Sequence, residues 1–311
     1  MSRWIHHRVA VCFGGTSNER PISLKTGRAI ADALEATGHD VHRIDLDRAG
    51  VRALVDLDPD VVFVALHGPG GEDGTLQGLL ELLSIPYTGS GVLGSALALD
   101  KVATKRMFAA FDVPTPAWAV VDPGATSLPA GLSAPCVVKP ALEGSSVGVS
   151  VVRTADAFAD AVAACATGRG EVLVEAFVDG RELSVGVFDG ELLGIVEIDP
   201  ADGFFDFAAK YERADTRYQL PALLDDDERR RVEAAALAAY RSVGARGVAR
   251  VDVMLGATTG PMVLEVNTVP GMTERSLVPQ MAAARGEAFD AFVARMLDAA
   301  RLDAPTTKGD A

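Results

Sequence analysis

The segment GVARVDVMLGATTGPMVLEVNT, residues 247–268, consists of two runs of alternating side chains around a turn. Alternation of this kind predicts an antiparallel hairpin. Because successive strand residues point to opposite faces, Arg250 and Asp252 share one face, as do Glu265 and Asn267. The expected strands are residues 248–255 and 262–267, and the expected turn is 256–261.

The register of this hairpin decides which polar side chains meet. We assume that Leu255 pairs with Met262 across the turn. Asp252 then lies opposite Glu265, with the two Cβ atoms about 5 Å apart. The same register places Arg250 opposite Asn267.

Two opposed carboxylates destabilise a hairpin unless a cation lies between them. Oxygen ligands from Asp252, Glu265 and Asn267 favour Mg²⁺ or Mn²⁺ over zinc. A hard cation held by few protein groups keeps positions open for phosphate oxygens. The alternative is a half-buried hairpin whose polar face is exposed to solvent. Its other face would be apolar, formed by Val251, Val253, Leu264 and Val266.

The first third of the chain alternates buried-type strands with amphipathic helices. This pattern predicts βαβ units and a parallel sheet, with ligand-binding loops at the strand ends. Glycine-rich breaks follow two of the strands, and no G-x-G-x-x-G dinucleotide fingerprint is present. The expected strands are 8–13, 41–44 and 60–66, and the expected helices are 23–36 and 75–83.

Beyond a helix at 100–111, short strands joined by turns predict an α+β region. The expected strands are 136–139, 147–152, 172–177, 183–188 and 192–198. The expected helices are 154–166, 225–243 and 289–301.

Composition excludes several classes of protein. The 311 residues suggest two domains, with three small ones possible. A net charge of −14 disfavours nucleic-acid binding. No run of 18 apolar residues exists, so no membrane span is expected. Residues 1–8 lack the features of a signal peptide, and the three cysteines, without a CxxC pair, indicate buried thiols in a cytoplasmic protein.

The segment KPALEGSSVGVS, residues 139–150, places a lysine on a strand before a loop of small residues. Such loops let backbone N–H groups approach phosphate oxygens. A strand rather than a helix follows, so this is no Walker A loop, and an ordinary Gly/Ser hairpin turn is the commoner explanation. Lys101 and Lys210 are further candidates for phosphate contacts, although single lysines are usually surface residues.

Together with the hairpin, several segments in a fixed order resemble the D-alanine–D-alanine ligases, a family of the ATP-grasp superfamily. The resemblance spans about residues 8–300. The segments are GGTSNER (14–20), ALHGPGGEDGTLQG (65–78), PYTGSG (86–91), LDK (99–101), KPALEGSSVG (139–148), AAKY (208–211), ARVDVM (249–254) and LEVNTVPGMTERSLVP (264–279).

The resemblance implies α/β and α+β architecture, with an ATP-grasp fold preceded by a Rossmann-like parallel-sheet domain. The implied N-terminal substrate domain covers residues 1–99. A central small ATP-grasp subdomain covers 100–182, and a C-terminal subdomain with the metal and second-substrate site covers 183–305. Residues 306–311 form a tail.

The implied activity is ATP-dependent carboxylate–amine ligation for peptidoglycan precursor synthesis. Two D-alanines and ATP give D-alanyl-D-alanine, ADP and phosphate through a D-alanyl phosphate. The implied cofactors are two Mg²⁺ or Mn²⁺ ions, and the implied assembly is a cytoplasmic homodimer without nucleic-acid or membrane partners.

The resemblance also implies residue roles. Glu19 would hold the first substrate's ammonium, and Arg250 with the Gly271 N–H would stabilise the oxyanion. His67 would line the D-alanine pocket, and Ser276 and Leu277 would receive the second substrate's carboxylate. Ser145 and Tyr211 would close a mobile loop together with Glu19.

The remaining implied roles concern ATP and the metals. Lys101, Lys139 and Lys210 would contact phosphates. The backbone of Glu175, Ala176, Phe177 and Val178 would meet adenine, and Glu182 would bind the ribose. Asp252, Glu265 and Asn267 would hold the metals, as the hairpin argument indicates independently.

The chain departs from the family pattern in three places. Residues 204–209 read FFDFAA where two tyrosines and an acidic residue are frequent, so loop closure or turnover is in doubt. Ala176 and Phe177 stand where Lys and Trp are frequent, and Pro21 stands where an acidic residue is usual. Tyr211 is retained, which favours the dipeptide over a D-alanyl-D-lactate ester.

Three alternatives remain. The chain could be another ATP-grasp ligase or the ester-forming variant, although Glu19, Tyr211, Ser276 and Leu277 disfavour both. A nucleotide-binding relative without chemistry should lack a metal ligand or Arg250. A purely structural domain would not need so many glycines at its strand ends.

Overall fold

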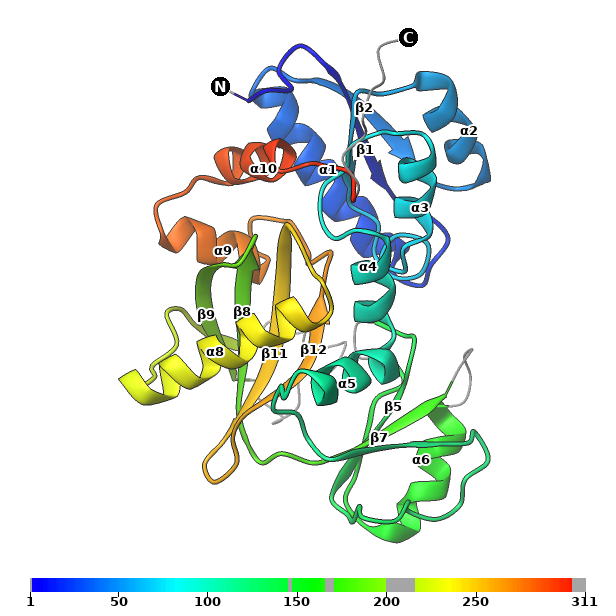
Figure 1. Cartoon of the computed structure of the whole chain (residues 1–311), viewed down its shortest axis with the longest axis vertical. Coiled ribbons are helices and arrows are strands. Elements are labelled where there is room, and N and C mark those ends of the chain that lie inside the picture. The colour runs from blue at the N-terminus through cyan, green and yellow to red at the C-terminus, as the bar shows by residue number, and fades with distance from the viewer. Residues whose placement is uncertain (1, 145–146, 166–170, 200–215, 304–311) are drawn as a thin grey trace.

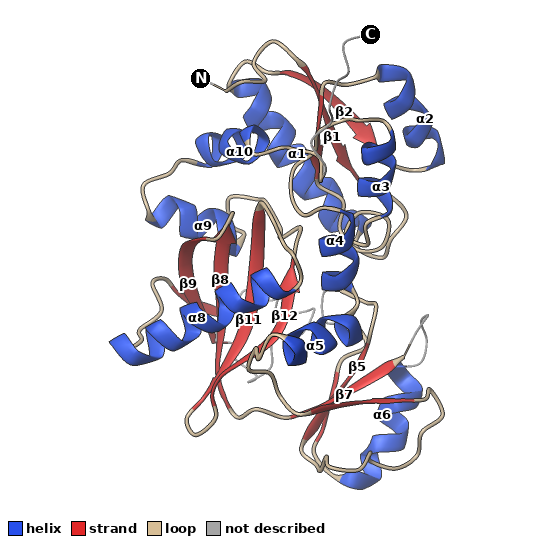
Figure 2. Cartoon of the chain, in the orientation of Figure 1, coloured by secondary structure: helices blue, strands red, loops and turns tan. Residues whose placement is uncertain are grey.

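The computed structural model describes residues 2–144, 147–165, 171–199 and 216–303. Within these ranges the strands form three sheets, each packed against helices (Figure 1). In Figure 2, strands covered by helices occupy the upper and middle parts of the molecule, and a further group of strands with a helix beside it lies at the bottom. No helix in these ranges is long and apolar enough to cross a bilayer.

The first sheet is parallel, with strand order β2-β1-β3, as the βαβ pattern predicts. Its strands are β1 (Arg8–Phe13), β2 (Asp40–Asp45) and β3 (Val61–Val64). Val9 and Val11 pack toward α1, whereas Ala10 and Cys12 pack in a separate cluster on the other face. Because both faces are covered, residues 9–13 of β1 are all apolar and buried, and only Arg8 at the start of the strand is charged and exposed.

Helices surround this sheet and connect it to the rest of the chain. Helix α10 packs beside α1 (Figure 1). The helices are α1 (Arg20–Ala36), α2 (Arg48–Leu57), α3 (Thr75–Leu82), α4 (Val92–Leu99), α5 (Lys101–Ala110) and α10 (Phe289–Asp298). Helix α1 begins at Arg20 rather than at residue 23, and Pro21 lies in its first turn, where a missing N–H costs little.

The second sheet is antiparallel, with order β4-β7-β5-β6, and one face packs against α6 (Phe158–Cys165), which follows a short 3₁₀ turn (Ala155–Ala157). Its strands are β4 (Trp118–Val121), β5 (Cys136–Pro140), β6 (Ser150–Val152) and β7 (Val172–Ala176). Cys12, Cys136 and Cys165 are all buried and free, as expected.

The third sheet is antiparallel, with order β10-β9-β8-β11-β12. Val251 and Val253 pack against α8, so the alternate residues Arg250 and Asp252 point to the face opposite this helix. The strands are β8 (Gly180–Phe188), β9 (Glu191–Asp199), β10 (Arg217–Gln219), β11 (Val248–Gly256) and β12 (Gly260–Asn267). The helices are α8 (Asp226–Ser242) and α9 (Leu277–Ala284).

The hairpin register differs from the assumed one near the turn. Leu255 pairs with Pro261, and residues 257–259 alone join the strands, so the pairing of Leu255 with Met262 and the longer turn were wrong. A β-bulge then shifts the register, and Asp252 pairs with Glu265 and Arg250 with Asn267, as predicted. The extra residue is Leu264.

The bulge also corrects the predicted apolar face. Leu264 was expected beside Val251 and Val253, but it instead lines the pocket that contains Glu265. Val263 takes its place in the core against α8. A bulged residue reverses the alternation of facing side chains, which explains the exchange.

Candidate active site

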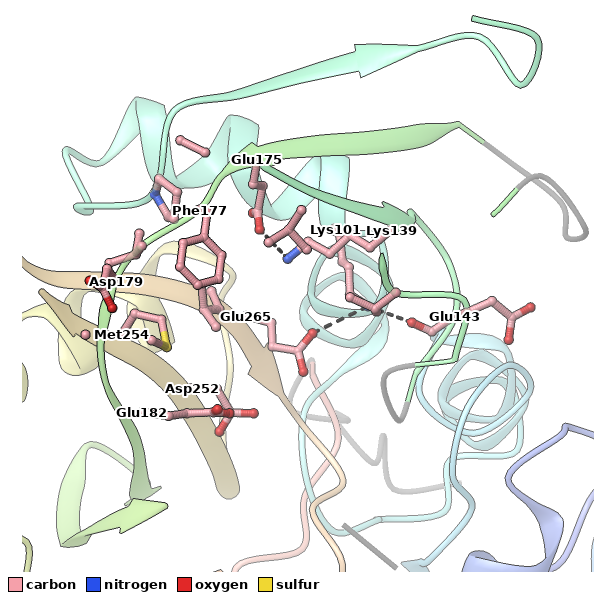
Figure 3. Close-up of a pocket in the computed structure, with 17 residues that line it drawn as sticks. Lys101, Lys139, Glu143, Glu175, Phe177, Asp179, Glu182, Asp252, Met254 and Glu265 are labelled. Atoms are coloured by element: carbon pink, nitrogen blue, oxygen red, sulfur yellow. Dashed lines mark hydrogen bonds and ion pairs between the residues drawn. The ribbon is translucent and has the colours of Figure 1, made fainter. Parts of the chain in front are cut away.

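A pocket opens between the second and third sheets, as Figure 3 shows. Lys139 and Glu175 line it from β5 and β7, whereas Asp252 and Glu265 line it from β11 and β12. Lys101, the first residue of α5, completes the polar wall. These three carboxylates and two lysines, from different elements, therefore converge on one cavity.

Asp252 is buried, and both of its oxygens are held. Its Oδ1 accepts hydrogen bonds from the Ser184 hydroxyl at 2.6 Å and from Arg250 Nε at 2.8 Å. Its Oδ2 accepts one from Arg250 Nη2 at 2.7 Å. Ser184 lies directly across from Asp252 on β8, so the sheet register sets the orientation of this carboxylate.

Lys101 connects α5 with Glu265, which lies opposite Asp252 on the hairpin. Its Nζ lies 3.5 Å from Glu265 Oε2 and donates to the Glu143 carbonyl at 2.7 Å (Figure 3). The Asp100 side chain caps α5 by accepting from the N–H groups of Val102 and Ala103. A capped helix start therefore holds the lysine beside the residues that follow strand β5.

The segment expected to meet adenine does line this pocket. Glu175, Ala176, Phe177 and Val178 form one wall, with Glu182 at the start of β8. Ala176 and Phe177 do not close the cavity, even though they replace the Lys and Trp frequent in the family.

A second pocket adjoins the first and shares Lys101 and Glu265 with it. Residues from both ends of the chain meet in this second pocket. It contains Glu19, His67, Arg250, Asn267 and Gly271, all of which the sequence singled out for substrate or metal contacts.

The carboxylate of Glu19 lies between two glycines from distant segments. A Cβ atom built on Gly68 or on Gly144 would lie 2.6 Å from Glu19 Oε2. Gly68 also has a φ of +74°, which side chains other than glycine rarely adopt. Glycine is therefore needed at both positions for this carboxylate to sit where it does.

His67 is buried and held on both ring nitrogens. Its Nδ1 lies 3.5 Å from Glu72 Oε1, and its Nε2 lies 3.1 Å from the Thr26 hydroxyl. The same hydroxyl accepts from the Met272 N–H at 3.4 Å, next to Gly271. Thr26 thus joins His67 to the segment after β12, a connection that the sequence analysis missed.

Ser276 and Leu277 lie at the start of α9, next to Gly271. A Cβ atom on Gly271 would lie 3.1 Å from Ser276 Oγ. The Ser276 hydroxyl accepts from the Thr273 N–H at 3.0 Å, which fixes the turn between Gly271 and the helix. Gly271 lines the second pocket, whereas Ser276 and Leu277 do not.

The most buried charges belong to a trio that the sequence analysis recognised only in part. Glu175 forms two ion pairs, with its Oε2 2.5 Å from Lys139 Nζ and its Oε1 2.5 Å from Lys105 Nζ. Burial alone would raise the pKa of Glu175, but the two ammonium groups outweigh it and hold this pKa below its usual value. Lys105 was missed because a lysine in a helix ordinarily indicates an exposed face.

Three expected site residues cannot be placed. Ser145, Lys210 and Tyr211 lie outside the described residues, as does the FFDFAA segment at 204–209. Their roles remain predictions.

Comparison with known proteins identifies the family. The model for the D-ala D-ala ligase C-terminus matches residues 107–298, and the model for the N-terminus matches residues 52–90. A D-alanine–D-alanine ligase from Anaeromyxobacter sp. (strain Fw109-5) is 48% identical over 310 residues, covering 98% of this chain and 100% of the relative. The chain belongs to the D-alanine–D-alanine ligase family.

Solved structures of this family support the fold. The D-alanine–D-alanine ligase from Bacillus anthracis complexed with ATP has a TM-score of 0.80 and 34% identity, covering 94% of this chain and 96% of that one. VanG D-Ala:D-Ser ligase from Enterococcus faecalis has a TM-score of 0.79 and 27% identity, covering 93% and 98%. The ATP-grasp ligase resemblance drawn from the eight segments is therefore confirmed.

Proposed function

We propose that this protein joins two D-alanines in an ATP-dependent reaction that gives D-alanyl-D-alanine, ADP and phosphate. The observation that carries the proposal is the adjacency of two pockets that share Lys101 and Glu265. One pocket has two lysines and a strand-end wall at residues 175–178, which suit a nucleotide. The other has a carboxylate, an arginine and a histidine suited to an amino acid.

In the first step, a carboxylate oxygen of one D-alanine attacks the γ-phosphorus of ATP, and ADP leaves. Lys101 and Lys139 lie where positive charge would offset the charge on the phosphate oxygens. Glu19 in the second pocket would pair with the ammonium of this D-alanine. The product of this step is a D-alanyl phosphate.

In the second step, the amine of the other D-alanine attacks the acyl carbon, and phosphate leaves. Negative charge develops on the acyl oxygen, and Arg250 with the Gly271 N–H would stabilise it. Ser276 and Leu277 at the start of α9 would receive the carboxylate of the attacking molecule.

Three oxygen donors along the two adjoining pockets fit a hard divalent cation, and of these only Glu265 lines both pockets. Asp252 and Glu265 are opposed across the hairpin, and Asn267 supplies an amide oxygen on the same face. These three residues would hold Mg²⁺ or Mn²⁺, which would neutralise phosphate charge. Within the described residues no group of three or more His, Cys, Asp or Glu side chains is arranged to hold a metal ion by itself, and the proposed set includes the amide of Asn267.

The boundaries at residues 99, 182 and 305, the homodimer and the cytoplasmic location are part of the same proposal. The three separate sheets support a division into three parts, with the boundary at 182 falling inside strand β8 (Gly180–Phe188) of the third sheet. The buried free thiols agree with a reducing compartment.

Phosphate release from Mg-ATP, with products identified by mass spectrometry, tests the proposal. Parallel reactions would contain D-alanine, L-alanine, D-alanine with D-lactate, or D-alanine with D-serine. We expect release with D-alanine alone and none with L-alanine, together with D-alanyl-D-alanine as the product. A preference for a mixed D-lactate or D-serine product would overturn the assignment of the second substrate. ATP binding without D-alanine-dependent release would overturn the ligase itself.

A further inference from the structure

Lys105 is a charged side chain beside the nucleotide pocket that no substrate would touch. Its side chain is 0% exposed, and it does not line the pocket. Its ammonium lies 2.5 Å from Glu175 Oε1 and donates to the Thr115 hydroxyl at 2.5 Å and to the Val263 carbonyl at 3.3 Å. The contacts come from separate elements, so the group is enclosed by protein.

The charges around Lys105 do not cancel. Two lysines, Lys105 and Lys139, share the single carboxylate of Glu175, which leaves one positive charge in excess. Buried charges without compensation are costly. Of the three side chains, Lys139 and Glu175 border the cavity, so an anion in the cavity can approach the excess charge only at Lys139.

We propose that Lys105 is a positioning residue for nucleotide binding: by occupying one oxygen of Glu175, it leaves Lys139 with uncancelled positive charge directed at a phosphate of the nucleotide. Without Lys105, Glu175 and Lys139 would form a closed one-to-one pair. This inference rests on the proposed function in one respect, that the anion is a nucleotide phosphate.

The surroundings of Lys105 support a fixed position. The Thr115 hydroxyl also donates to the Val263 carbonyl at 2.7 Å, and the Val263 N–H donates to the Pro114 carbonyl at 2.7 Å. Val263 lies on β12, the strand that carries Glu265. Lys105 therefore connects α5, β7 and β12, and it fixes Glu175 relative to the strand that bears a proposed metal ligand.

Titration behaviour agrees with this geometry. Burial lowers the pKa of Lys105, Glu175 raises it and Lys139 lowers it, and the net result is a pKa of about 8. Lys105 is thus still charged at pH 7, and Glu175 is the group that keeps it so.

A double-mutant cycle tests the inference, with ATP binding measured by calorimetry in Mg²⁺ without D-alanine. Lys105→Met should weaken ATP binding about tenfold or more, because Glu175 then cancels Lys139. Adding Glu175→Gln should recover ATP binding. In the Glu175→Gln background, Lys105→Met should therefore weaken ATP binding at most about threefold. Lys25→Met, which removes an exposed lysine from α1, is the matched control and should bind as the wild type does.

The outcomes separate the two proposals. Wild-type protein that binds no ATP would overturn the proposed function. A different outcome is that the wild type binds ATP and Lys105→Met weakens ATP binding equally with Glu175 and with Gln at position 175. That outcome would overturn the role of Lys105 but not the proposed function, because a merely structural defect is not repaired by removing the Glu175 charge. If Lys105→Met does not fold, the double variant still decides, since it contains no unpaired buried carboxylate. Binding by the double variant tenfold weaker than by Glu175→Gln would contradict the inference.

Discussion

Arg250 and Asp252 form a two-point ion pair on one face of β11, with Nε to Oδ1 at 2.8 Å and Nη2 to Oδ2 at 2.7 Å. The proposed oxyanion-stabilising group and a proposed metal ligand are thus held by each other. Pairing of this kind fixes the guanidinium plane and shields a buried carboxylate. Substitution of either residue is therefore expected to disturb the other. Their roles are separated by measuring metal binding for Asp252 and acyl transfer for Arg250.

Asp252→Asn keeps the shape of the side chain and removes its charge. Ligation should fall about 100-fold or more, since several kcal/mol of phosphate charge stabilisation depend on the cation. Affinity for Mn²⁺ in the presence of ADP, followed by electron paramagnetic resonance, should fall in parallel. Asp226→Asn, an exposed position on α8, is the control and should change neither quantity. Unchanged Mn²⁺ affinity in Asp252→Asn would remove Asp252 from the metal site.

Arg250→Ala should lower acyl transfer far more than nucleotide binding, which is affected only through loss of the ion pair with Asp252. Arg250 borders the second pocket and does not line the nucleotide pocket. Loss of an oxyanion-stabilising donor costs about 10²- to 10³-fold in turnover. Ligation rates and ATP binding, measured separately, check this prediction. Full turnover by Arg250→Ala would contradict the oxyanion role.

Thr26→Val removes the hydroxyl between His67 and the Met272 N–H while conserving volume. Both polar groups would lose a buried partner, which costs about 1–3 kcal/mol of stability. The KM for D-alanine should rise several-fold as His67 and the segment around Gly271 loosen, whereas the KM for ATP should stay the same. Thr26→Ser, which restores the hydroxyl, should recover both quantities. A rise in the KM for ATP alone would show that Thr26 serves a different site.

Stability should depend on pH through Lys105. Its pKa is about 8 in the folded chain, against a usual value of 10.5. Between these pH values the unfolded chain binds more protons at this site than the folded chain does, so the free energy of unfolding should rise with pH. The contribution amounts to roughly 3 kcal/mol over the whole of this pH range. The groups facing the ammonium are Glu175, Lys139, Thr115 and the more distant Glu265.

Denaturant unfolding of the wild type and of Lys105→Met at pH 7.5 and 9.5 measures this contribution. The difference between the two proteins cancels the titration of other groups. The wild type should gain stability relative to Lys105→Met as the pH rises. A constant difference would show that Lys105 has an ordinary pKa.

Most strands and helices could be predicted from the sequence, but several elements could not. Strand β1 was predicted at its observed bounds, because its apolar run is flanked by charge and by glycine. Helix α2 was missed because Leu54 is almost its only buried apolar residue. Helices α4 and α9 were missed because their sequences, VLGSALAL and LVPQMAAA, are apolar almost throughout and lack the polar face that marks helical periodicity.

By itself, the sequence determined the family, the two polar pairs of the hairpin and most of the residues that line both pockets. Order and spacing along the chain carry that information, because alternation, glycine-rich breaks and motif order are local properties. Only the tertiary structure decided the bulge at Leu264, the enclosure of Glu19 between Gly68 and Gly144, and the burial of Lys105 beside Glu175. These features depend on contacts between segments far apart in the chain, where local pattern says nothing about which side chains meet or which charges lose their water.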